Sequence, residues 1–421
     1  MGKDRISELP KELLLQILSL LPKNTLITTS VLSKGWRSLW KLIPKLEFES
    51  DNQEDITKFS ENVGKFLLSH KAPVLESLHI KVTDKTENRY DIDVGVWLGI
   101  AVVRHVRELV LDLFFKDSFR FPSSVFFCDT LETLKLKYSV LVDVPSPVCM
   151  KSLRTLHLVS VEFKDNESFL NLISGCPNLE DLAIHWARGT RKVVLTLVIA
   201  APCLKRLLID GKIGGLADGG YVINAPSLEY LKINCGCFLI ENAPMLVEAN
   251  ISNVSYILND KILGSLKSAK RLSLDISPLE IKCHTGAIFY RLVYLEMHTR
   301  EAEWWNLLRI MLDSSPKLQV LKLIDHYQDV SKDDMVSWKW NEPKYVPECL
   351  LSHLETFVWI RYDWEREEEN EVATYILKNA RRLKKATFST NPIESKEKLE
   401  MLNAFNRVKA SNSCHAPCKI N

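Results

Sequence analysis

Most of the chain repeats one pattern, in which an apolar residue is followed three and five positions later by two more. The polar residues between the last two apolar positions give the alternation typical of a strand with one buried face. The pattern recurs at steps of 18 residues (Leu228 to Leu246) to 31 residues (Leu75 to Val106). The triplets are Leu75-Leu78-Ile80, Val106-Leu109-Leu111, Leu131-Leu134-Leu136, Leu153-Leu156-Leu158, Leu179-Leu182-Ile184, Leu204-Leu207-Ile209, Leu228-Leu231-Ile233, Leu246-Ala249-Ile251, Ala269-Leu272-Leu274, Leu292-Leu295-Met297 and Leu318-Leu321-Leu323.

Self-similarity at roughly 20 to 29 residues with this triplet is the signature of leucine-rich repeats. One repeat cannot bury its apolar face alone, so neighbours stack into a solenoid with a parallel sheet on the concave side. Apolar periodicity predicts helices over 56–69, 167–174 and 302–313, whereas returns such as 220–225 have room only for strands or turns. The sequence therefore predicts an α/β fold, with an irregular, curved repeat region over residues 49–339 and helices and turns on its convex side.

The outward strand positions mix both signs of charge with a few aromatic side chains. That composition suits a protein or peptide partner better than a polyphosphate chain, which favours one sign. Because adjacent strands lie about 4.8 Å apart, outward residues of neighbouring repeats should form one patch roughly five strands wide. Tyrosine and arginine are frequent at binding hot spots. The candidate target-binding residues are Arg206, Tyr230, Lys232, Arg271 and Tyr294. The alternative is that they only shield the sheet.

The first forty residues follow another pattern. Pro10 suits the first position of a helix, and Pro22 ends that helix. Between them lie the apolar residues Leu13, Leu14, Leu15, Ile17, Leu18, Leu20 and Leu21. One buried stripe needs about three apolar positions in seven. This helix has more, so either the rest of the chain or a partner must cover its additional apolar surface.

Together with Val31-Leu32-Ser33, Trp36-Arg37 and Leu39-Trp40, the residues Leu9-Pro10, Leu13-Leu14 and Ile17-Leu18 resemble an F-box of the plant type, over residues 5–46. The resemblance implies a three-helix module that docks on the Skp-type adaptor of a cullin–RING ubiquitin ligase. The residues it implies for that dock or its supporting core are Leu9, Pro10, Leu14, Ile17, Leu18, Val31, Leu32 and Trp36. Gly35 departs from the family's usual basic residue, and glycine inside a helix costs about 1 kcal/mol. An amphipathic hairpin packed on its own domain is the alternative.

The pattern changes again from Trp340. Pro343, Pro347-Glu348-Cys349-Leu350 and Ile376-Leu377-Lys378-Asn379-Ala380 resemble the FBD domain that follows F-box and leucine-rich repeats in plant proteins, over residues 340–390. The residues predict two strands around a helix at 367–380, whose acidic start favours the helix dipole. This strand–helix–strand unit should cap the open end of the solenoid. The expected domains are thus 1–48 (F-box), 49–339 (repeats), 340–390 (FBD) and 391–421, the last with a helix over 395–409 and a frayed tail over 411–421.

Composition limits the functions further. The chain has 421 residues, 46% of them hydrophobic and 26% charged, with a net charge of +2. These values are ordinary for a soluble globular protein and give no global argument for nucleic acid or membrane binding. The N-terminus lacks the apolar core of a signal peptide, so we expect a cytoplasmic or nuclear protein. The basic segment 381–385 is either a solvated strand edge or a nuclear signal.

Candidate chemistry is sparse. Cys235 with Cys237, and Cys414 with His415 and Cys418, are the closest ligand groups, and neither has a second pair at zinc-finger spacing. We expect no metal and no cofactor. The chain has no Gly-rich phosphate loop, no Gly-x-Ser-x-Gly and no His-Glu-x-x-His motif. The sequence therefore favours a non-catalytic protein.

Three functional hypotheses remain. The leading one, implied by the resemblance, is a substrate-recognition subunit of a Skp–cullin–F-box ubiquitin ligase. Its partners are the adaptor and, through it, the cullin–RING ligase, and the concave face captures an unknown protein target. A second hypothesis is a small-ligand sensor, for which Arg206, Lys232 and Arg271 are the cations that would converge. The third is an interaction scaffold that works without a ligase.

Overall fold

The computed structural model describes residues 9–19, 39–50, 56–83, 93–186, 196–211, 220–236, 238–253, 263–276, 288–299, 304–325, 340, 342–390, 395–410 and 418–420. The chain divides into two compact units. Unit 1 comprises Met1–Leu204 and Ile213–Asp218, and unit 2 comprises Lys205–Lys212 and Gly219–Asn421.

A parallel sheet forms the frame of unit 1. Its described strands, in sheet order, are β1 (Lys45–Glu49), β2 (Ser77–Thr83), β3 (Glu108–Phe114), β5 (Thr133–Tyr138), β7 (Thr155–Val159) and β9 (Asp181–His185). The leucines of the predicted triplets pair in register from strand to strand, as Leu109 does with Leu134 and Leu134 with Leu156. All three are fully buried, which confirms that each repeat buries its leucines against its neighbours.

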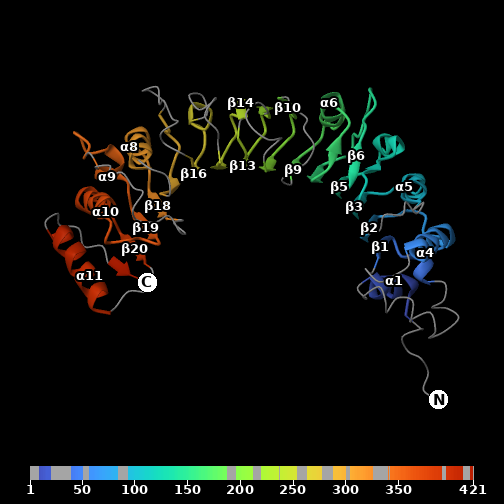
Figure 1. Ribbon diagram of the computed structural model, residues 1–421, viewed down its shortest axis with the longest axis horizontal. Helices are drawn as coiled ribbons and strands as arrows, with labels where there is room; N and C mark the ends of the chain where they lie inside the picture. The colour runs from blue at the N-terminus through green and yellow to red at the C-terminus, as the bar shows by residue number, and fades with distance from the viewer. Residues whose placement is uncertain are drawn as a thin grey trace, which may run out of the picture. The chain divides into compact units, whose positions relative to one another are not determined.

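Three helices lie on one face of this sheet: α4 (Ile56–Ser69), α5 (Val94–Val103) and α6 (Asn166–Ser174) (Figure 1). The predictions of helices over 56–69 and 167–174 are confirmed within one residue. Helix α5 was not predicted, because its residues are apolar on almost every side and give no helical stripe. It buries Trp97, whose ring lies edge-on to that of Phe59 with centroids 6.2 Å apart.

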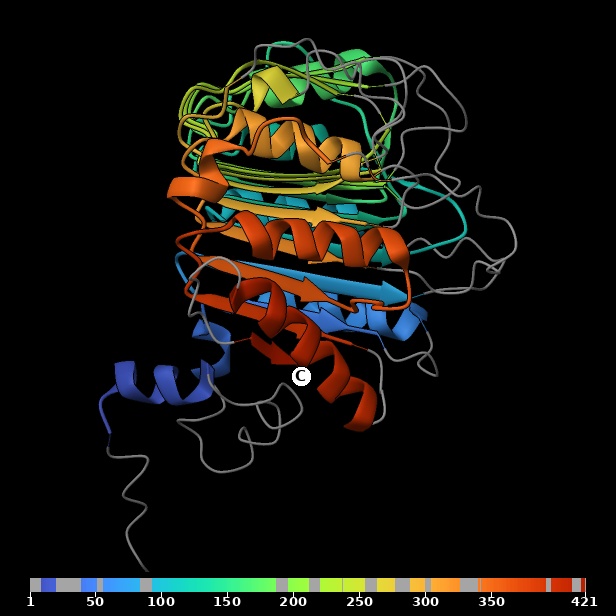
Figure 2. The ribbon, with the colours of Figure 1, turned by 90° about the vertical axis from the view of Figure 1, so that its left-hand side faces the viewer.

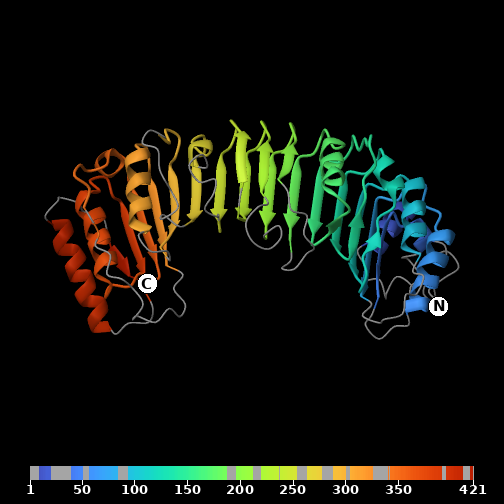
Figure 3. The ribbon, with the colours of Figure 1, turned by 45° about the horizontal axis from the view of Figure 1, so that its top comes forward.

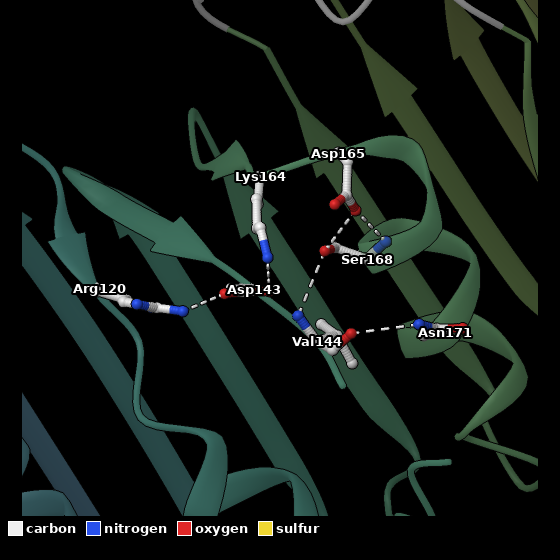
Figure 4. A network of polar contacts seen from close by, with 7 residues as sticks. All are labelled: Arg120, Asp143, Val144, Lys164, Asp165, Ser168 and Asn171. Carbon is white, nitrogen blue, oxygen red and sulfur yellow. Dashed lines mark hydrogen bonds and ion pairs between the residues drawn. The ribbon is translucent and has the colours of Figure 1, made fainter. Parts of the chain in front are cut away.

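Short return strands form a second, smaller parallel sheet in unit 1: β4 (Phe119–Arg120), β6 (Val140–Val142) and β8 (Glu162–Phe163). Figure 4 shows the polar contacts that join these returns to α6. Asp143 accepts hydrogen bonds from Arg120 and, at 3.2 Å, from Lys164, and these bonds hold the pKa of its carboxyl below the ordinary value. Asp165 caps α6 by accepting from the Ser168 backbone N–H at 2.8 Å. This network is a structural link between repeats.

Unit 2 continues the same architecture. Each described strand of its main sheet pairs in parallel with the next (Figure 3). The strands are β11 (Arg206–Asp210), β13 (Tyr230–Asn234), β15 (Glu248–Ser252), β16 (Arg271–Asp275), β17 (Tyr294–His298), β18 (Val320–Ile324), β19 (Thr356–Ile360), β20 (Lys385–Ser389) and β21 (Cys418–Ile420). The short returns β12 (Tyr221–Asn224) and β14 (Phe238–Asn242) also pair in parallel, as the lack of room for a helix predicted.

Helices lie on one face of this sheet too: α8 (Trp304–Ser314), α9 (Glu348–Ser352) and α10 (Glu367–Asn379) (Figure 1). The predictions over 302–313 and 367–380 are confirmed within two residues. A final helix, α11 (Ser395–Ala410), lies beside α10 (Figure 2). Its Phe405 stacks on Phe388 of β20 with ring centroids 4.5 Å apart. The strand–helix–strand unit β19–α10–β20 therefore extends the sheet and its core by two more repeats.

The tail prediction needs a correction. Residues 411–421 were expected to be frayed, but Cys418–Ile420 forms β21, which pairs with β20 through Ala386, Thr387 and Phe388. Ile420 is buried. One buried isoleucine in a polar segment is too weak a pattern for sequence reasoning to recognise, and the prediction was wrong for these three residues.

The acidic start of α10 contains a buried ion cluster. Glu369 is buried, receives the Asp363 backbone N–H at 3.0 Å and lies 3.0 Å from the Arg366 guanidinium. Asp325 shares the same guanidinium at 3.3 Å. Burial raises the pKa of Glu369 to about 8, against the opposing effects of the Asp363 N–H and of Arg366. The cluster joins β18 to α10, so these carboxylates have partners within the fold.

Candidate functional site

The first candidate site is α1 (Lys11–Ser19), which has two apolar sides. One side packs into a small core in which Leu14 and Leu18 meet Leu39 and Ile43, and all four side chains are buried. The other side carries Leu9 just before the helix, then Leu13 and Ile17, which are 37%, 45% and 38% exposed. Spacing of four residues within the helix puts Leu13 and Ile17 on one stripe, and Leu9 precedes them at the same spacing outside the helix. Helix α1 thus has its own core and, apart from it, an exposed aliphatic stripe.

Sequence reasoning assigned Leu9, Pro10, Leu14, Ile17 and Leu18 to the adaptor dock or its supporting core. The structure separates these roles, because Leu14 and Leu18 belong to the core whereas Leu9, Pro10 and Ile17 are exposed. It also adds Leu13, which sequence reasoning left out of the candidate set. The remaining predicted residues, Val31, Leu32 and Trp36, lie outside the described residues, as does Gly35.

Hydrogen bonds fix the end of this module to the first repeats of unit 1. The backbone N–H groups of Lys71 and Ala72 donate to the Lys41 carbonyl at 2.7 and 3.1 Å. The buried His70 imidazole bridges Ile43 and Arg104: Nε2 lies 2.8 Å from the Ile43 carbonyl, and Nδ1 lies 2.7 Å from Arg104 Nη1. Since a guanidinium only donates, Nδ1 must accept and Nε2 must carry the proton.

Burial lowers the pKa of His70, and the positive charge of Arg104 lowers it further, although the bond to Ile43 opposes both. The neutral imidazole is the form that can accept from Arg104 while donating to Ile43. The connection between the module and the repeats is therefore a set of directional bonds rather than a single flexible link.

The second candidate site is the face of the unit 2 sheet opposite its helices, here called the open face. Register places Arg206 beside Tyr230, Tyr230 beside Glu248, Glu248 beside Arg271, and Arg271 beside Tyr294. These residues form one row across adjacent strands, and Lys232 lies in the next row on β13. We call Arg206, Tyr230, Lys232, Arg271 and Tyr294 the tyrosine–arginine patch.

Cation–π contacts order this patch. The Arg206 guanidinium lies 4.6 Å from the centroid of the Tyr230 ring, and that of Arg271 lies 4.0 Å from the centroid of Tyr294. Arg271 Nε also lies 3.3 Å from a Glu248 carboxylate oxygen. Arg206 and Arg271 stand three strands apart. The two guanidinium groups therefore stack on separate tyrosines. They do not converge on one point, whereas a polyphosphate ligand would require such convergence.

A polar network that the sequence did not reveal lies next to the patch. Glu296 accepts hydrogen bonds from Ser273 at 2.9 Å, Tyr294 at 3.0 Å and Lys322 at 2.8 Å. Burial, together with the bond to Glu296, raises the pKa of Tyr294 to about 12, so its hydroxyl stays a donor. Burial acts to raise the pKa of Glu296, but the bonds from Lys322, Ser273 and Tyr294 outweigh it and lower that pKa. These partners come from three strands, and only the register reveals them.

The open face of unit 2 can offer a partner ordered aromatic rings, guanidinium groups and carboxylates. Lys232 is exposed and has no ion-pair partner within the described part of the chain. Among the described residues there is no group of histidine, cysteine, aspartate and glutamate side chains able to hold a metal ion. Cys237, Cys414 and His415 lie outside those residues. Within the described ranges, no helix has the length and apolar composition that a membrane crossing needs.

Comparisons with known proteins agree with this architecture. The F-box domain model matches residues 6–48, and the FBD model matches residues 342–388. The model for the leucine-rich repeats of FBD-associated F-box protein At5g56370 matches residues 94–254. These three models define an F-box protein with leucine-rich repeats and a C-terminal FBD domain.

Relatives from Arabidopsis thaliana are named for F-box and FBD segments. F-box/FBD/LRR-repeat protein At3g52680 is 58% identical over 436 residues, which cover 100% of this chain and 94% of the relative. FBD-associated F-box protein At3g52670 is 58% identical over 426 residues, covering 98% of this chain and 97% of the relative. The chain belongs to the F-box/FBD/LRR-repeat family. F-box domains generally bind Skp-type adaptors, and the family names point to adaptor proteins rather than enzymes.

Proposed function

We propose that this chain is the substrate-recognition subunit of a Skp–cullin–F-box ubiquitin ligase. The observation that carries the proposal is the exposed aliphatic surface of Leu13 and Ile17 on α1 and of Leu9 just before it, within the segment that matches the F-box model. Side chains of this size stabilise by about 1.5–3 kcal/mol each when they are buried. A segment that already has its own core and still exposes three of them suits a protein partner.

Two binding surfaces give the mechanism. Helix α1 holds the Skp-type adaptor, and the tyrosine–arginine patch holds the target. Neither surface performs chemistry. The subunit raises the effective concentration of the target's lysines at the ubiquitin carrier, which other subunits of the ligase supply. Tyrosine and arginine suit the target side because they contribute large contact area and several donors from few residues.

Co-purification tests the adaptor half of the proposal. The full chain, expressed with a Skp-type adaptor, a cullin and a RING subunit, should elute with all three from a size-exclusion column. The expected stoichiometry is one copy of each, measured by native mass spectrometry. Elution of the chain apart from the adaptor, while the other three subunits stay together, would contradict the proposal.

A triple change tests the target half. Replacing Tyr230, Arg271 and Tyr294 with alanine removes both rings that receive a guanidinium and one guanidinium. Hot-spot changes cost about 2 kcal/mol or more each, so target capture in cells should fall by more than tenfold. The measurement is the amount of target recovered with the tagged chain after its degradation has been blocked, and adaptor recovery should stay unchanged.

A matched control uses the same residue types elsewhere in unit 2. Tyr290, Arg291 and Tyr345 are exposed and lie outside the strands. Changing these three to alanine should leave target capture at the level of the unchanged chain. If both triple variants capture the target equally well, the tyrosine–arginine patch is not the recognition site.

A further inference from the structure

The open face of the last strands in unit 2 differs in composition from the strands before them. The outward residues of β18 and β19 include Val320, Ile324, Val358 and Ile360, all half-buried and all β-branched. Register places Val358 between Lys322 on β18 and Thr387 on β20. The described outward residues of β18–β21 are all aliphatic, lysine, serine or threonine. We call the outward positions of β18–β21 the lysine–aliphatic face.

This face has charge of one sign. Its lysines are Lys322, Lys385 and Lys419, and none of its described outward residues is a carboxylate. Lys322 is bonded to Glu296 on the neighbouring β17, whereas Lys385 and Lys419 are exposed and have no ion-pair partner within the described residues. Earlier strands of the same sheet carry outward carboxylates as well as cations, as β15, β16 and β17 do with Glu248, Asp275 and Glu296. The change of charge pattern therefore begins at β18, the strand before the FBD segment, and continues through β19 and β20 of that segment.

The turn before β20 adds to this field. Three exposed cations lie there: Arg381, Arg382 and Lys384. Lys384 Nζ lies 2.8 Å from a carboxylate oxygen of Glu355. The segment that sequence analysis could interpret as either a strand edge or a nuclear signal thus borders the lysine–aliphatic face. Exposed cations in excess of carboxylates attract an acidic partner.

The aliphatic residues decide which acidic partner fits. Proteins that hold single-stranded nucleic acid combine cations with aromatic side chains on which bases stack. No described outward residue of β18–β21 is aromatic. Valine and isoleucine side chains instead offer an apolar surface that suits the aliphatic side chains of a peptide. Neighbouring residues of an extended peptide point to opposite sides, so residues two apart share one side. Acidic and aliphatic residues at such positions can therefore meet the face together.

We propose that the lysine–aliphatic face binds a segment of a target protein that is rich in aspartate or glutamate and in aliphatic residues. The FBD segment then has a recognition role beside its structural one. The inference rests on the target-capture half of the proposed function and adds a second contact to it. It does not require the adaptor, so it can be tested on the full chain alone.

The test is selection from a random 12-residue peptide library displayed on phage, with the full chain immobilised. Selected peptides should be enriched in acidic and aliphatic residues relative to the starting library. A synthetic peptide from that set should bind in fluorescence anisotropy. Its affinity should fall at least fivefold between 50 and 500 mM salt, because exposed charges are screened over that range.

Charge reversal locates the site. Lys385→Glu with Lys419→Glu should weaken the peptide at least tenfold, since two attractions become repulsions. The matched control is Arg309→Glu with Lys378→Glu, two exposed residues on α8 and α10, which lie on the helix-bearing face of the same unit. This control changes the net charge equally and should leave the affinity within twofold. Val358→Thr with Ile360→Thr should reduce the aliphatic preference in a repeated selection and leave the acidic preference in place.

Three results would overturn the proposal. One is a selection without acidic and aliphatic enrichment. Another is equal loss of affinity in the two charge-reversal variants, which would indicate a general charge effect. The third is displacement of the peptide by a 12-nucleotide single strand of thymidine at equal concentration, which would make the face a nucleic-acid site. Loss of adaptor binding in a separate pull-down would contradict the ligase assignment and leave the peptide result standing.

Discussion

Replacing Leu13 and Ile17 with aspartate should abolish binding to the Skp-type adaptor without unfolding the chain. Both side chains are exposed on α1 and neither belongs to its core. In the complex each aspartate would be a buried carboxylate without a partner, which costs several kcal/mol. We therefore expect the affinity to fall more than a hundredfold. Calorimetric titration with purified adaptor gives the affinity, and circular dichroism gives the melting curve.

Two further variants separate docking from folding. Leu14→Asp with Leu18→Asp places charges in the core with Leu39 and Ile43, so it should lose adaptor binding together with local structure. Removing residues 1–38 takes away α1 and keeps β1 with the Lys41 and Ile43 contacts to the repeats, so it should abolish adaptor binding and leave the repeats folded. If the Leu13 and Ile17 variant still binds the adaptor with its original affinity, the exposed stripe is not the docking surface.

A chain that stops at residue 327 should aggregate. Strand β18 would become an open edge, because the five pairs that join it to β19 are lost. The fully buried Leu321 and Leu323 would lose Phe357 and Trp359, their neighbours in the sheet. Removing one buried aromatic side chain costs about 3–5 kcal/mol, and an apolar edge with unpaired backbone groups invites association. Size-exclusion chromatography with light scattering should find most of the protein in large species.

A chain that stops at residue 410 is the matched truncation. It loses β21, which pairs with three residues of β20, and keeps β19, α10 and β20. This chain should stay monomeric, with a melting temperature slightly below that of the full chain. If the chain ending at residue 327 were equally soluble and monomeric, the FBD segment would not be the cap that protects the sheet.

The sequence predicted the repeats because each triplet contains its own evidence. An inward position such as Leu134 is apolar whatever its neighbours are, and the strand alternation follows from it. The same rule extends beyond the eleven triplets, to Ile43-Leu46-Phe48, which leads into β1, and to Leu354-Phe357-Trp359, which leads into β19. The first of these was hidden by the F-box pattern that overlaps it. Helix α5 has no polar residues between its apolar ones, so its helical period could not be recognised from the sequence.

The candidate sites could be predicted only in part. Outward strand positions follow from the triplet, so the row from Arg206 to Tyr294 was accessible from sequence. The side-chain contacts within this row could not be predicted from the sequence. Arg271 could contact Glu248 on one neighbouring strand or Tyr294 on the other, and the structure shows that it contacts both. On α1 five of the nine residues are apolar and lie on more than one side, and the exposed side depends on Leu39 and Ile43, some twenty residues further on. Leu13 was missed for that reason.

The alternation along each strand has a consequence for how such proteins change over time. The fully buried leucines of β5 that carry stability point one way, and the side chains of Thr133, Lys135 and Lys137 that a partner would meet point the other. A substitution at an outward position removes little buried apolar area, so it costs little free energy of unfolding. A duplicated copy of such a chain can therefore exchange its whole outward surface, one residue at a time, and remain folded at every step.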